Sequence, residues 1–273
     1  MAGTEKTRVV VVGADGRMGR MIRRLAEEDE NFILAGLVDR EESLKAGLQN
    51  CGLPAARSLD ELAAVVSGAV AIDFTAPEAS MVTARTAAAR GIPLVIGTTG
   101  FTEAQKAELR ELARQTPLFW SANMSVGVNV LLRLLPELAR ALGPAYDMEM
   151  VEIHHGRKKD APSGTALALG ERLAEARGWS LPDVRCSARD GIIGARPRAE
   201  IGIQAVRGGD VVGVHTVYFL GPGERIEVTH QAHSRENFAG GALRAARWLA
   251  TRTPGRLYSM EDTFAPQADG RES

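Results

Sequence analysis

The residues of this sequence that could do chemistry are concentrated in one short stretch, HHGRKKDAPSGTA, which spans residues 154–166. Five of the six positions from His154 to Lys159 carry side chains that are or can become cations. Such a cluster could bind a metal, bind an anion, transfer protons or simply face the solvent. The residues around it help to separate these four interpretations.

The spacing of the histidines argues against a metal site. His154 and His155 close a predicted strand, so their side chains should point to opposite faces of a sheet. The remaining histidines, His215, His230 and His233, fall in a separate predicted hairpin and lack HxxxH spacing. We therefore expect no bound metal.

The residues that follow the cluster favour an anion site. The sequence DAPSGT, residues 160–165, precedes an apolar periodic helix. Ser163, Gly164 and Thr165 should therefore offer hydroxyl groups and unpaired N–H groups at a helix N-terminus. Together with the cations of residues 155–159, they would form a pocket for carboxylates or phosphates. A solvated loop is the more usual explanation of an RKK run, but this run adjoins a helix start.

The first 120 residues predict strands that alternate with helices. Strands are expected at residues 8–13, 34–39, 70–75, 93–98 and 117–122. Helices are expected after the glycine turn at 13–19, from TAPE at 75–78, which has the cap-Pro-acid pattern of a helix start with Thr75 as the cap, and over 102–115, where Thr102 and Gln105 suggest a capping box. This alternation predicts an α/β fold with a Rossmann-type doubly wound parallel sheet.

A glycine turn lies where such a sheet would bind a dinucleotide, between the first strand and the first helix. Its residues are Gly13, Ala14, Asp15, Gly16, Arg17 and Met18, followed by Gly19. Asp39 ends the second strand, where an acid usually binds the adenosine ribose, and the adjacent Arg40 could pair with a 2'-phosphate. We therefore expect NADH, NADPH or both as cofactor. The spacing is GxxGxxG rather than GxGxxG, so a plain tight turn and a solvated strand end stay open as alternatives.

Two further loops follow predicted parallel strands. They contain Gly97, Thr98 and Thr99 in one case, and Ser121, Ala122, Asn123 and Met124 in the other. Ligands of open α/β sheets bind outside the carboxyl ends of the strands, so both loops are placed to line a nicotinamide site. A small-residue turn is the alternative for each.

The second half of the chain predicts an α+β domain with a mixed or antiparallel sheet. Apolar residues trace a helix face from Val128 to Leu142, with Pro136 predicting a kink or a break. A strand at 147–155 and a helix at 163–177 follow. Strands at 200–206, 211–220 and 225–232, joined by RGGD and GPGE turns, predict an antiparallel meander. We expect a dinucleotide-binding domain at 1–124, completed by a last helix within 234–273, and a substrate-binding and oligomerisation domain at 125–233.

Composition limits the other classes of function. The net charge is -1 over 273 residues, which gives no sign of a nucleic-acid or membrane partner. The two cysteines, Cys51 and Cys186, lie far apart and suggest reduced thiols. No secretory apolar region and no run of about 18 apolar residues is present, so a cytoplasmic location is expected.

The stretch EMVEIHHGRKKDAPSGTA, residues 149–166, resembles the hallmark motif of the 4-hydroxy-tetrahydrodipicolinate reductase (dihydrodipicolinate reductase) family of the bacterial lysine pathway. The resemblance continues through GADGRMG, AIDFTAPE, VIGTTGF, SANMSVGVN and GDVVGVHTVYF, in order along the chain. It implies a homotetramer of two-domain subunits that reduces a cyclic dicarboxylate with a nicotinamide cofactor.

The resemblance also implies roles for individual residues. His154 would be the acid/base residue, Lys158 a second proton donor, and His155, Gly164 and Thr165 would hold the substrate carboxylates. The family's nucleotide contacts carry over to residues 13–18, 39–40, 97–99 and 121–124.

The chain departs from the family's pattern at a few positions. Met124 replaces a frequent phenylalanine, and Met150 replaces isoleucine or valine. Asp15 and Asp39 argue against a strong preference for NADPH.

Two other functions stay open at the level of sequence. The first is another Rossmann dehydrogenase of the aspartate pathway, similar to aspartate or homoserine dehydrogenase. The second is a non-catalytic NAD(P)-sensing protein, although the near-zero net charge offers no basic face for a nucleic-acid partner.

Overall fold

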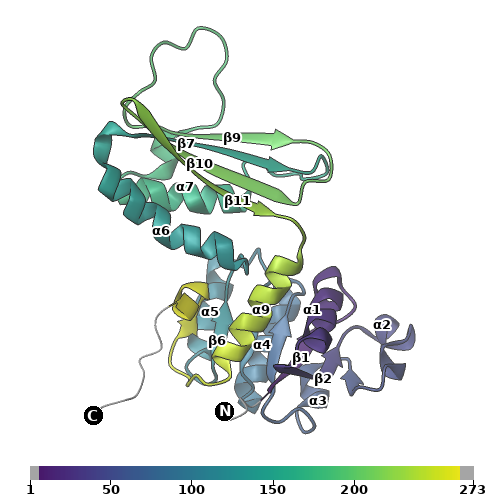
Figure 1. The fold of residues 1–273 in the computed structure, drawn as a ribbon. Coiled ribbons are helices and arrows are strands. Elements are labelled where there is room, and N and C mark those ends of the chain that lie inside the picture. Colours follow the sequence, from purple (N-terminus) through teal and green to yellow (C-terminus); the bar gives the residue numbers. More distant parts are fainter. Residues whose placement is uncertain (1–5, 265–273) are drawn as a thin grey trace. The chain divides into compact units, whose positions relative to one another are not determined.

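The computed structural model describes residues 6–264, which form two compact units (Figure 1). Unit 1 comprises residues 6–126 and 236–264, and unit 2 comprises residues 127–235. Each unit contains one sheet. None of the helices within the described residues is both long and apolar enough to cross a membrane.

Unit 1 is built on a seven-stranded sheet in the order β12-β6-β5-β4-β1-β2-β3. All its neighbouring strands are parallel, which confirms the predicted Rossmann-type sheet. The strands are β1 (Thr7–Val12), β2 (Phe32–Val38), β3 (Ala55–Ala56), β4 (Val70–Asp73), β5 (Leu94–Ile96), β6 (Leu118–Trp120) and β12 (Leu257–Tyr258). The sequence did not predict β3 and β12, because a strand of two residues has too little pattern to be recognised.

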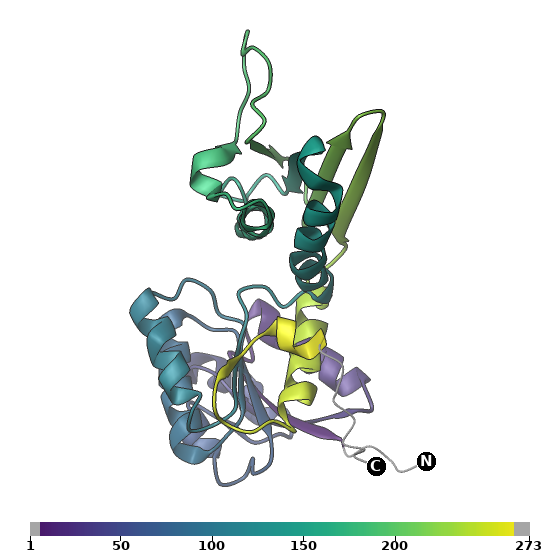
Figure 2. The same cartoon turned by 90° about the vertical axis from the view of Figure 1, so that its left-hand side faces the viewer.

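Helices cover both faces of this sheet (Figure 2). They are α1 (Arg17–Glu28), α2 (Glu41–Lys45), η1 (Leu48–Asn50), α3 (Leu59–Leu62), α4 (Pro77–Arg90), α5 (Glu103–Leu112), α9 (Glu236–Leu249) and η3 (Met260–Phe264). Val9 and Val11 of β1 belong to the core with α1 and α9, whereas Val10 and Val12 belong to the core with α3, α4 and α5. Both faces of β1 are therefore buried, which explains its unbroken run of valines.

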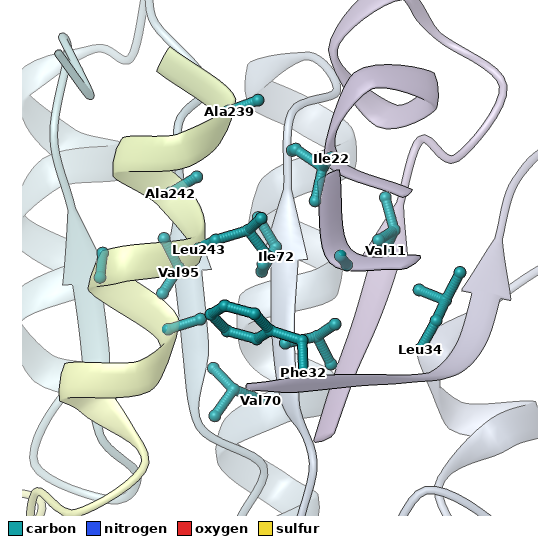
Figure 3. Packing of buried hydrophobic residues seen from close by; sticks show 14 of the residues in the cluster. Val11, Ile22, Phe32, Leu34, Val70, Ile72, Val95, Ala239, Ala242 and Leu243 are labelled. Atoms are coloured by element: carbon teal, nitrogen blue, oxygen red, sulfur yellow. The ribbon is translucent and has the colours of Figure 1, made fainter. Parts of the chain in front are cut away.

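The last long helix, α9, contributes to the core of unit 1. Ala239, Ala242 and Leu243 lie in the same buried cluster as Ile72 of β4 and Val95 of β5 (Figure 3). The small alanines let the helix approach the sheet closely. Residues from the C-terminal part of the chain thus complete one face of a sheet formed mainly by the N-terminal part.

Helix starts in unit 1 follow the predicted signals, with one shift. Thr102 and Gln105 form a capping box at the start of α5, as predicted. At α4 the N-cap is Ala76 rather than Thr75, and Pro77 occupies the first turn. The Thr75 hydroxyl instead donates to the Asp73 carboxylate at 2.6 Å, so this side chain joins a buried cluster rather than capping the helix.

Unit 2 contains a five-stranded mixed sheet in the order β11-β10-β7-β9-β8. Its strands are β7 (Asp147–His154), β8 (Arg185–Cys186), β9 (Ile201–Arg207), β10 (Gly213–Gly221) and β11 (Glu224–Ala232). The predicted three-strand meander was wrong, because β7 lies between β9 and β10 and pairs with β9 in parallel. The RGGD turn bonds to the end of β7, where Gly208 N–H donates to the His154 carbonyl (3.0 Å) and His155 N–H to the Val211 carbonyl (2.8 Å).

Helices cover one face of this second sheet. They are α6 (Val126–Leu142), η2 (Gly143–Ala145), α7 (Gly164–Ala176) and α8 (Leu181–Val184). The first residue of α6, Val126, is the last residue of the first segment of unit 1. Pro136 lies inside α6 without ending it, so the predicted break was wrong. Leu135, Pro136 and Ala139 are all buried, and this packing offsets the hydrogen bond that proline cannot make.

Candidate active site

In unit 1, the glycine turn shapes the start of α1. Gly13 has a φ of 76°, a conformation that favours glycine, and its N–H donates to the Val38 carbonyl of β2 at 2.8 Å. A Cβ at Gly19 would overlap the Gly13 carbonyl oxygen, so only glycine allows the helix to pack this closely on the turn. Gly16 caps α1 without a side-chain hydrogen bond. The first N–H groups of the helix therefore suit an anion such as a pyrophosphate.

The Asp39 carboxylate at the end of β2 holds the backbone of this turn. It accepts hydrogen bonds from the Asp15 N–H (2.7 Å) and the Arg40 N–H (2.8 Å). The Asp15 side chain pairs with Arg20 at 3.0 Å, and this hydrogen bond lowers the pKa of Asp15. The negative charge of Asp15 thus has a cationic partner within the helix, while the Arg17 and Arg40 side chains are exposed.

A buried carboxyl group that the sequence analysis missed lies beside the GTTG loop. Asp73 is fully buried at the end of β4, and burial raises its pKa. The Thr75 N–H donates to Oδ1 of Asp73 (2.8 Å), and the Ser80 hydroxyl lies 3.0 Å from the same oxygen and 2.7 Å from the Thr98 hydroxyl. Gly97 packs on Phe74, whose ring a Cβ at Gly97 would overlap. The signal in the sequence was an aspartate directly after a short apolar strand.

The Thr98 side chain is therefore directed into the protein, while Thr99 is exposed. Thr98 still contributes a carbonyl at the strand end, and this carbonyl accepts from Nε1 of Trp120 at 3.0 Å. Of the GTTG loop, Thr99 and Gly100 are the exposed residues.

The SANM loop after β6 is stabilised largely by its own hydrogen bonds. The Ser121 hydroxyl donates to the Asn123 carbonyl (2.7 Å), and the Asn123 side-chain oxygen accepts from the Ser125 N–H (2.8 Å). Met124 is only 2% exposed and packs in the core with α9, where a Cβ at Gly241 would overlap its carbonyl oxygen. The Met124 side chain thus fills the core, and Ala122 is the exposed residue of this loop.

These segments all lie at one edge of the first sheet. The turn, Asp39, the GTTG loop and the SANM loop follow β1, β2, β5 and β6, whose carboxyl ends share an edge because the strands are parallel. The sequence-predicted cofactor residues are therefore brought to a common edge, the usual place for a dinucleotide in this fold.

In unit 2, the face of β7 that packs on the helices ends in two chemically active residues. Residues of β7 are alternately buried and partly buried, and Met148, Met150, Glu152 and His154 form the buried face. Nδ1 of His154 lies 2.6 Å from Oε2 of Glu152. The sequence analysis missed Glu152, although a glutamate two positions before a histidine in a strand shares its face.

Glu152 is fully buried and accepts hydrogen bonds from three other groups. Arg207, paired with His154 in the β7–β9 register, donates from Nη1 to Oε2 and from Nη2 to Oε1, each at 2.7 Å. The Ser163 N–H donates to Oε1 at 2.9 Å. Burial alone would raise the pKa of Glu152, but the hydrogen bonds from Arg207, His154 and Ser163 outweigh it, so the pKa is lowered. Glu152 is therefore an ionised carboxylate.

His215 of β10 also lies next to His154. The predicted hairpin that carries His215 is present, because β10 pairs with β11, but it is not separate from His154, because β10 also pairs with β7. Their ring centroids are 5.1 Å apart, and Nε2 of His215 is 3.0 Å from the Ser163 hydroxyl. Burial, followed by the charge of His154, lowers the pKa of His215 to about 4. Burial also lowers the pKa of His154, against the opposing effect of Glu152. Both imidazoles are therefore neutral near pH 7.

The loop between β7 and α7 holds the remaining predicted residues. Lys158 pairs with Asp160 at 2.9 Å. Nδ1 of His155 is buried and has no hydrogen-bond partner among residues 6–264. Arg157 and Lys159 are exposed.

Ser163 is the N-cap of α7 and is buried. Its hydroxyl accepts from the Ala166 N–H at 3.1 Å, so this side chain serves the helix and the histidine cluster. Gly164, by contrast, is exposed, and Thr165 is partly exposed. Within residues 6–264, no group of three or more histidine, cysteine, aspartate or glutamate side chains is arranged to hold a metal ion, and Cys51 and Cys186 are free thiols.

The chemistry of this arrangement follows from its parts. A neutral imidazole oriented by a carboxylate can accept or return a proton. The N-terminus of a 13-residue helix and the nearby cationic loop can bind an anion. Unit 2 thus places a group capable of acid/base chemistry beside a potential anion site, and the turn of unit 1 has the geometry that suits a dinucleotide.

The chain is similar to proteins of one family over nearly its whole length. The model of the dihydrodipicolinate reductase N-terminus matches residues 7–124, and that of the C-terminus matches residues 127–264. The 4-hydroxy-tetrahydrodipicolinate reductase of Desulfovibrio desulfuricans is 66% identical over 258 residues, covering 94% of this chain and 99% of that protein. The protein of the same name from Anaeromyxobacter dehalogenans is 52% identical, covering 94% and 97%.

Solved structures show the same fold. A dipicolinate-bound dihydrodipicolinate reductase from Paenisporosarcina sp. TG-14 has a TM-score of 0.76 at 24% identity, covering 94% of this chain and 99% of that chain. A probable dehydrogenase from Thermotoga maritima has a TM-score of 0.61 at 13% identity. The two matching models span both units at high coverage, and the chain belongs to the dihydrodipicolinate reductase family.

Proposed function

We propose that this protein reduces 4-hydroxy-tetrahydrodipicolinate to tetrahydrodipicolinate with NADH or NADPH, in lysine and diaminopimelate biosynthesis. The observation that carries the proposal is the buried His154–Glu152 pair beside the loop and helix start of residues 155–165. Relatives that are 62–66% identical over almost their full length bear the reductase name. The protein is accordingly an oxidoreductase.

The unit 2 residues fit a substrate with two carboxylates. The unpartnered Nδ1 of His155 and the N-terminus of α7 at Gly164 and Thr165 would each bind a carboxylate oxygen. A cyclic dicarboxylate with a ring C=N would lose water there and become ready to accept a hydride. One related structure is described as bound to dipicolinate, a planar molecule with two carboxylates.

Proton transfer falls to His154 and Lys158. His154 is neutral near pH 7 because burial lowers its pKa, so it can take up a proton during loss of water. A dianion beside it favours its protonated form, so the same ring can return that proton. Lys158 is the nearby ammonium group and would act as a second donor.

The unit 1 residues fit a nicotinamide dinucleotide, which would supply the hydride when bound. The first N–H groups of α1 and the turn at residues 13–18 would hold the pyrophosphate. Asp39 would accept hydrogen bonds from the adenosine ribose, and the exposed Arg40 could pair with a 2'-phosphate. Residues 97–99 and 121–124 would line the nicotinamide, mainly with backbone groups because Thr98 and Met124 are buried. Measuring kcat/KM separately for NADH and NADPH tests whether both are used.

The open face of the unit 2 sheet supports a homotetramer. The face opposite the helices carries several apolar side chains at paired positions, namely Val151, Ile153, Val206, Val214, Tyr218 and Leu220. Val206 is 46% exposed and Leu220 is 37% exposed, which is costly for a sheet face in water. We propose that copies of this chain cover the face in a cytoplasmic tetramer, and a measured mass of one subunit in solution would contradict this.

A pair of substitutions tests the catalytic assignment. His154→Gln and Lys158→Ala should each lower kcat by about 10²-fold or more, because each removes a proton-transfer group. Cofactor affinity, measured by fluorescence titration, should stay within about twofold. Loss of cofactor binding, or full turnover in both variants, would refute the assignment. Inhibition by pyridine-2,6-dicarboxylate would separate this function from the aspartate or homoserine dehydrogenase alternative, which no comparison favours.

A further inference from the structure

Both carboxylate oxygens of Glu152 have two polar contacts each within the protein. Oε2 lies 2.6 Å from Nδ1 of His154 and accepts from Nη1 of Arg207 at 2.7 Å. Oε1 accepts from the Ser163 N–H at 2.9 Å and from Nη2 of Arg207 at 2.7 Å. Removing this carboxylate and its four donor groups from water costs free energy. If the contacts served stability alone, apolar side chains in place of Glu152 and Arg207 would serve as well. The arrangement therefore points to a role in the reaction.

We propose that Glu152, held by Arg207, is a positioning residue that fixes the tautomer and orientation of His154 for proton transfer. This inference rests on the proposed function, because it assigns a role in the same reaction. Glu152 does not touch the substrate in this scheme. It acts only through the histidine.

The tautomer follows from the hydrogen-bonding capacity of the carboxylate. An ionised carboxylate can only accept, so a contact of 2.6 Å between Oε2 and Nδ1 requires the proton to lie on Nδ1. Nε2 of His154 then carries the lone pair and is the atom that exchanges a proton. Gly213 of β10 leaves room for this edge of the ring, since a Cβ there would lie 3.0 Å from Nε2.

Arg207 gives the carboxylate a single orientation. Its guanidinium group makes a bidentate contact in which Nη1 and Nη2 each donate to one carboxylate oxygen, and this contact holds the two groups in one plane. Nη2 also donates to the Asp160 carbonyl at 2.7 Å. Glu152 therefore connects His154 to both ends of the segment from Asp160 to Ser163, which leads into the proposed carboxylate site. One side chain, Glu152, thus fixes the position of His154 relative to the proposed carboxylate site.

The charged and titratable groups that face His154 come from three strands and one loop. They are Glu152 on its own strand, Arg207 on β9, His215 on β10 and Lys158 in the loop. Glu152 raises the pKa of His154, while burial, Lys158 and Arg207 lower it. Loss of the Glu152 charge should therefore move the His154 ionisation to lower pH.

The first test is Glu152→Gln, which keeps the shape of the side chain and removes its charge. Whichever way the amide is placed, its NH₂ group meets a donor of Arg207, and one placement gives His154 the wrong tautomer. We expect kcat to fall by about 10²-fold, with the limb of the pH profile due to His154 shifted to lower pH. KM for the cofactor should stay within about twofold.

A double substitution separates positioning from a structural role. If Glu152 acts only through His154, then Glu152→Gln should cause no further loss of kcat in a His154→Gln protein. Glu149→Gln is the matched control, because Glu149 lies on the same strand, is also held by arginines and faces the opposite side. Its kcat should stay within about twofold of wild type. Additive losses in the double variant would overturn the inference.

A second measurement does not depend on turnover. Nitrogen-15 NMR of the imidazoles in the full-length protein should show His154 protonated on Nδ1 near pH 7. This state should be lost in Glu152→Gln, because an NH₂ group placed next to His154 avoids the Ser163 N–H donor and makes Nδ1 an acceptor. If Glu152→Gln fails to fold, Arg207→Lys tests the orientation of the carboxylate instead. Lysine cannot make the bidentate contact, so kcat should fall by a smaller factor, while the retained carboxylate should keep the proton of His154 on Nδ1. Protonation on Nε2 in the wild-type protein would refute the inference. If the wild-type protein does not turn over the substrate, the proposed function fails, while the tautomer is still decided by NMR.

Discussion

Glu149 and Glu152 lie on the same strand, β7, but face opposite sides of the sheet. The comparison of the two shows how the side of the sheet determines what a carboxylate contacts. Both are held by arginines, and in both the hydrogen bonds lower the pKa against the effect of burial. Glu152 faces the helices, is fully buried and contacts His154. Glu149 faces the open side and is bonded by Arg189 (2.7 and 2.9 Å) and Arg196 (2.8 Å) from the loop between β8 and β9.

The difference lies in what each carboxylate connects. Glu149 attaches a surface loop to the sheet, with side chains that stay partly in water. Glu152 attaches His154 to the start of α7 in a buried environment. The same pair of residue types thus stabilises a loop on one face and positions a histidine on the other.

The largest effect that distinguishes the two faces is expected in stability. Glu152→Ala should lower the free energy of unfolding by about 4 kcal/mol, because it removes a fully buried carboxylate and leaves the buried Ser163 N–H and His154 Nδ1, as well as Arg207, without their common acceptor. Glu149→Ala should cost about 1 kcal/mol, since its arginines can turn to water and to Glu200. Urea unfolding, with hydrogen exchange of the β7 amides as the local probe, measures both. Equal losses would show that the two faces do not differ in the way described.

A smaller effect is expected in the pH dependence of the free energy of unfolding. The folded-state pKa of His215 is about 4, below the ordinary value of 6.5, so the unfolded chain binds this proton more readily. The stability that His215 contributes is therefore complete above about pH 6.5 and is lost as the pH falls toward about 4. The loss should reach about 3 kcal/mol, at about 1.4 kcal/mol for each unit of pKa.

The matched variant for this prediction is His215→Gln, which cannot take up the proton. It should flatten the decline between pH 6.5 and pH 4 by about that amount. Unfolding free energies measured at several pH values for both proteins test this. An unchanged slope in the variant would assign the acid sensitivity to other groups. Glu152 contributes little over this range, because its stabilising effect is lost only below its ordinary pKa of 4.5.

The sequence predicted unit 1 better than unit 2, for a physical reason. The valines of β1, the capping box at Thr102 and the turn at Gly13 are local signals, and parallel strands joined by helices allow few arrangements. In unit 2, the insertion of β7 between β9 and β10 depends on pairing between distant segments. No local pattern distinguishes it from a meander.

The candidate site divides in the same way. His154, His155 and Lys158 lie together in one motif, so the sequence alone could single them out as candidates. Glu152 was readable from its spacing to His154, but Arg207 and His215 reach that histidine only through the strand order. Glu152 was thus missed despite a local signal, whereas no local signal marks Arg207 and His215, which long-range strand pairing brings to His154.

The smallest effect is expected in how ionic strength changes the local opening of the loop at residues 187–200. Ion pairs that remain partly in water are screened as the ionic strength rises, whereas buried pairs are screened much less. Raising the salt concentration from about 0.1 to about 1 M should therefore loosen the loop attached by Arg189 and Arg196 but leave the Glu152–Arg207 contact intact. Limited proteolysis should cut residues 187–200 about two- to threefold faster at high salt, because a loss of about 0.5 kcal/mol changes a local opening equilibrium by that factor. Hydrogen exchange of the β7 amides near Glu152 should not change. Equal sensitivity of the loop and of these amides would mean that the buried carboxylate is reached by solvent, and the distinction between the two faces of β7 would fail.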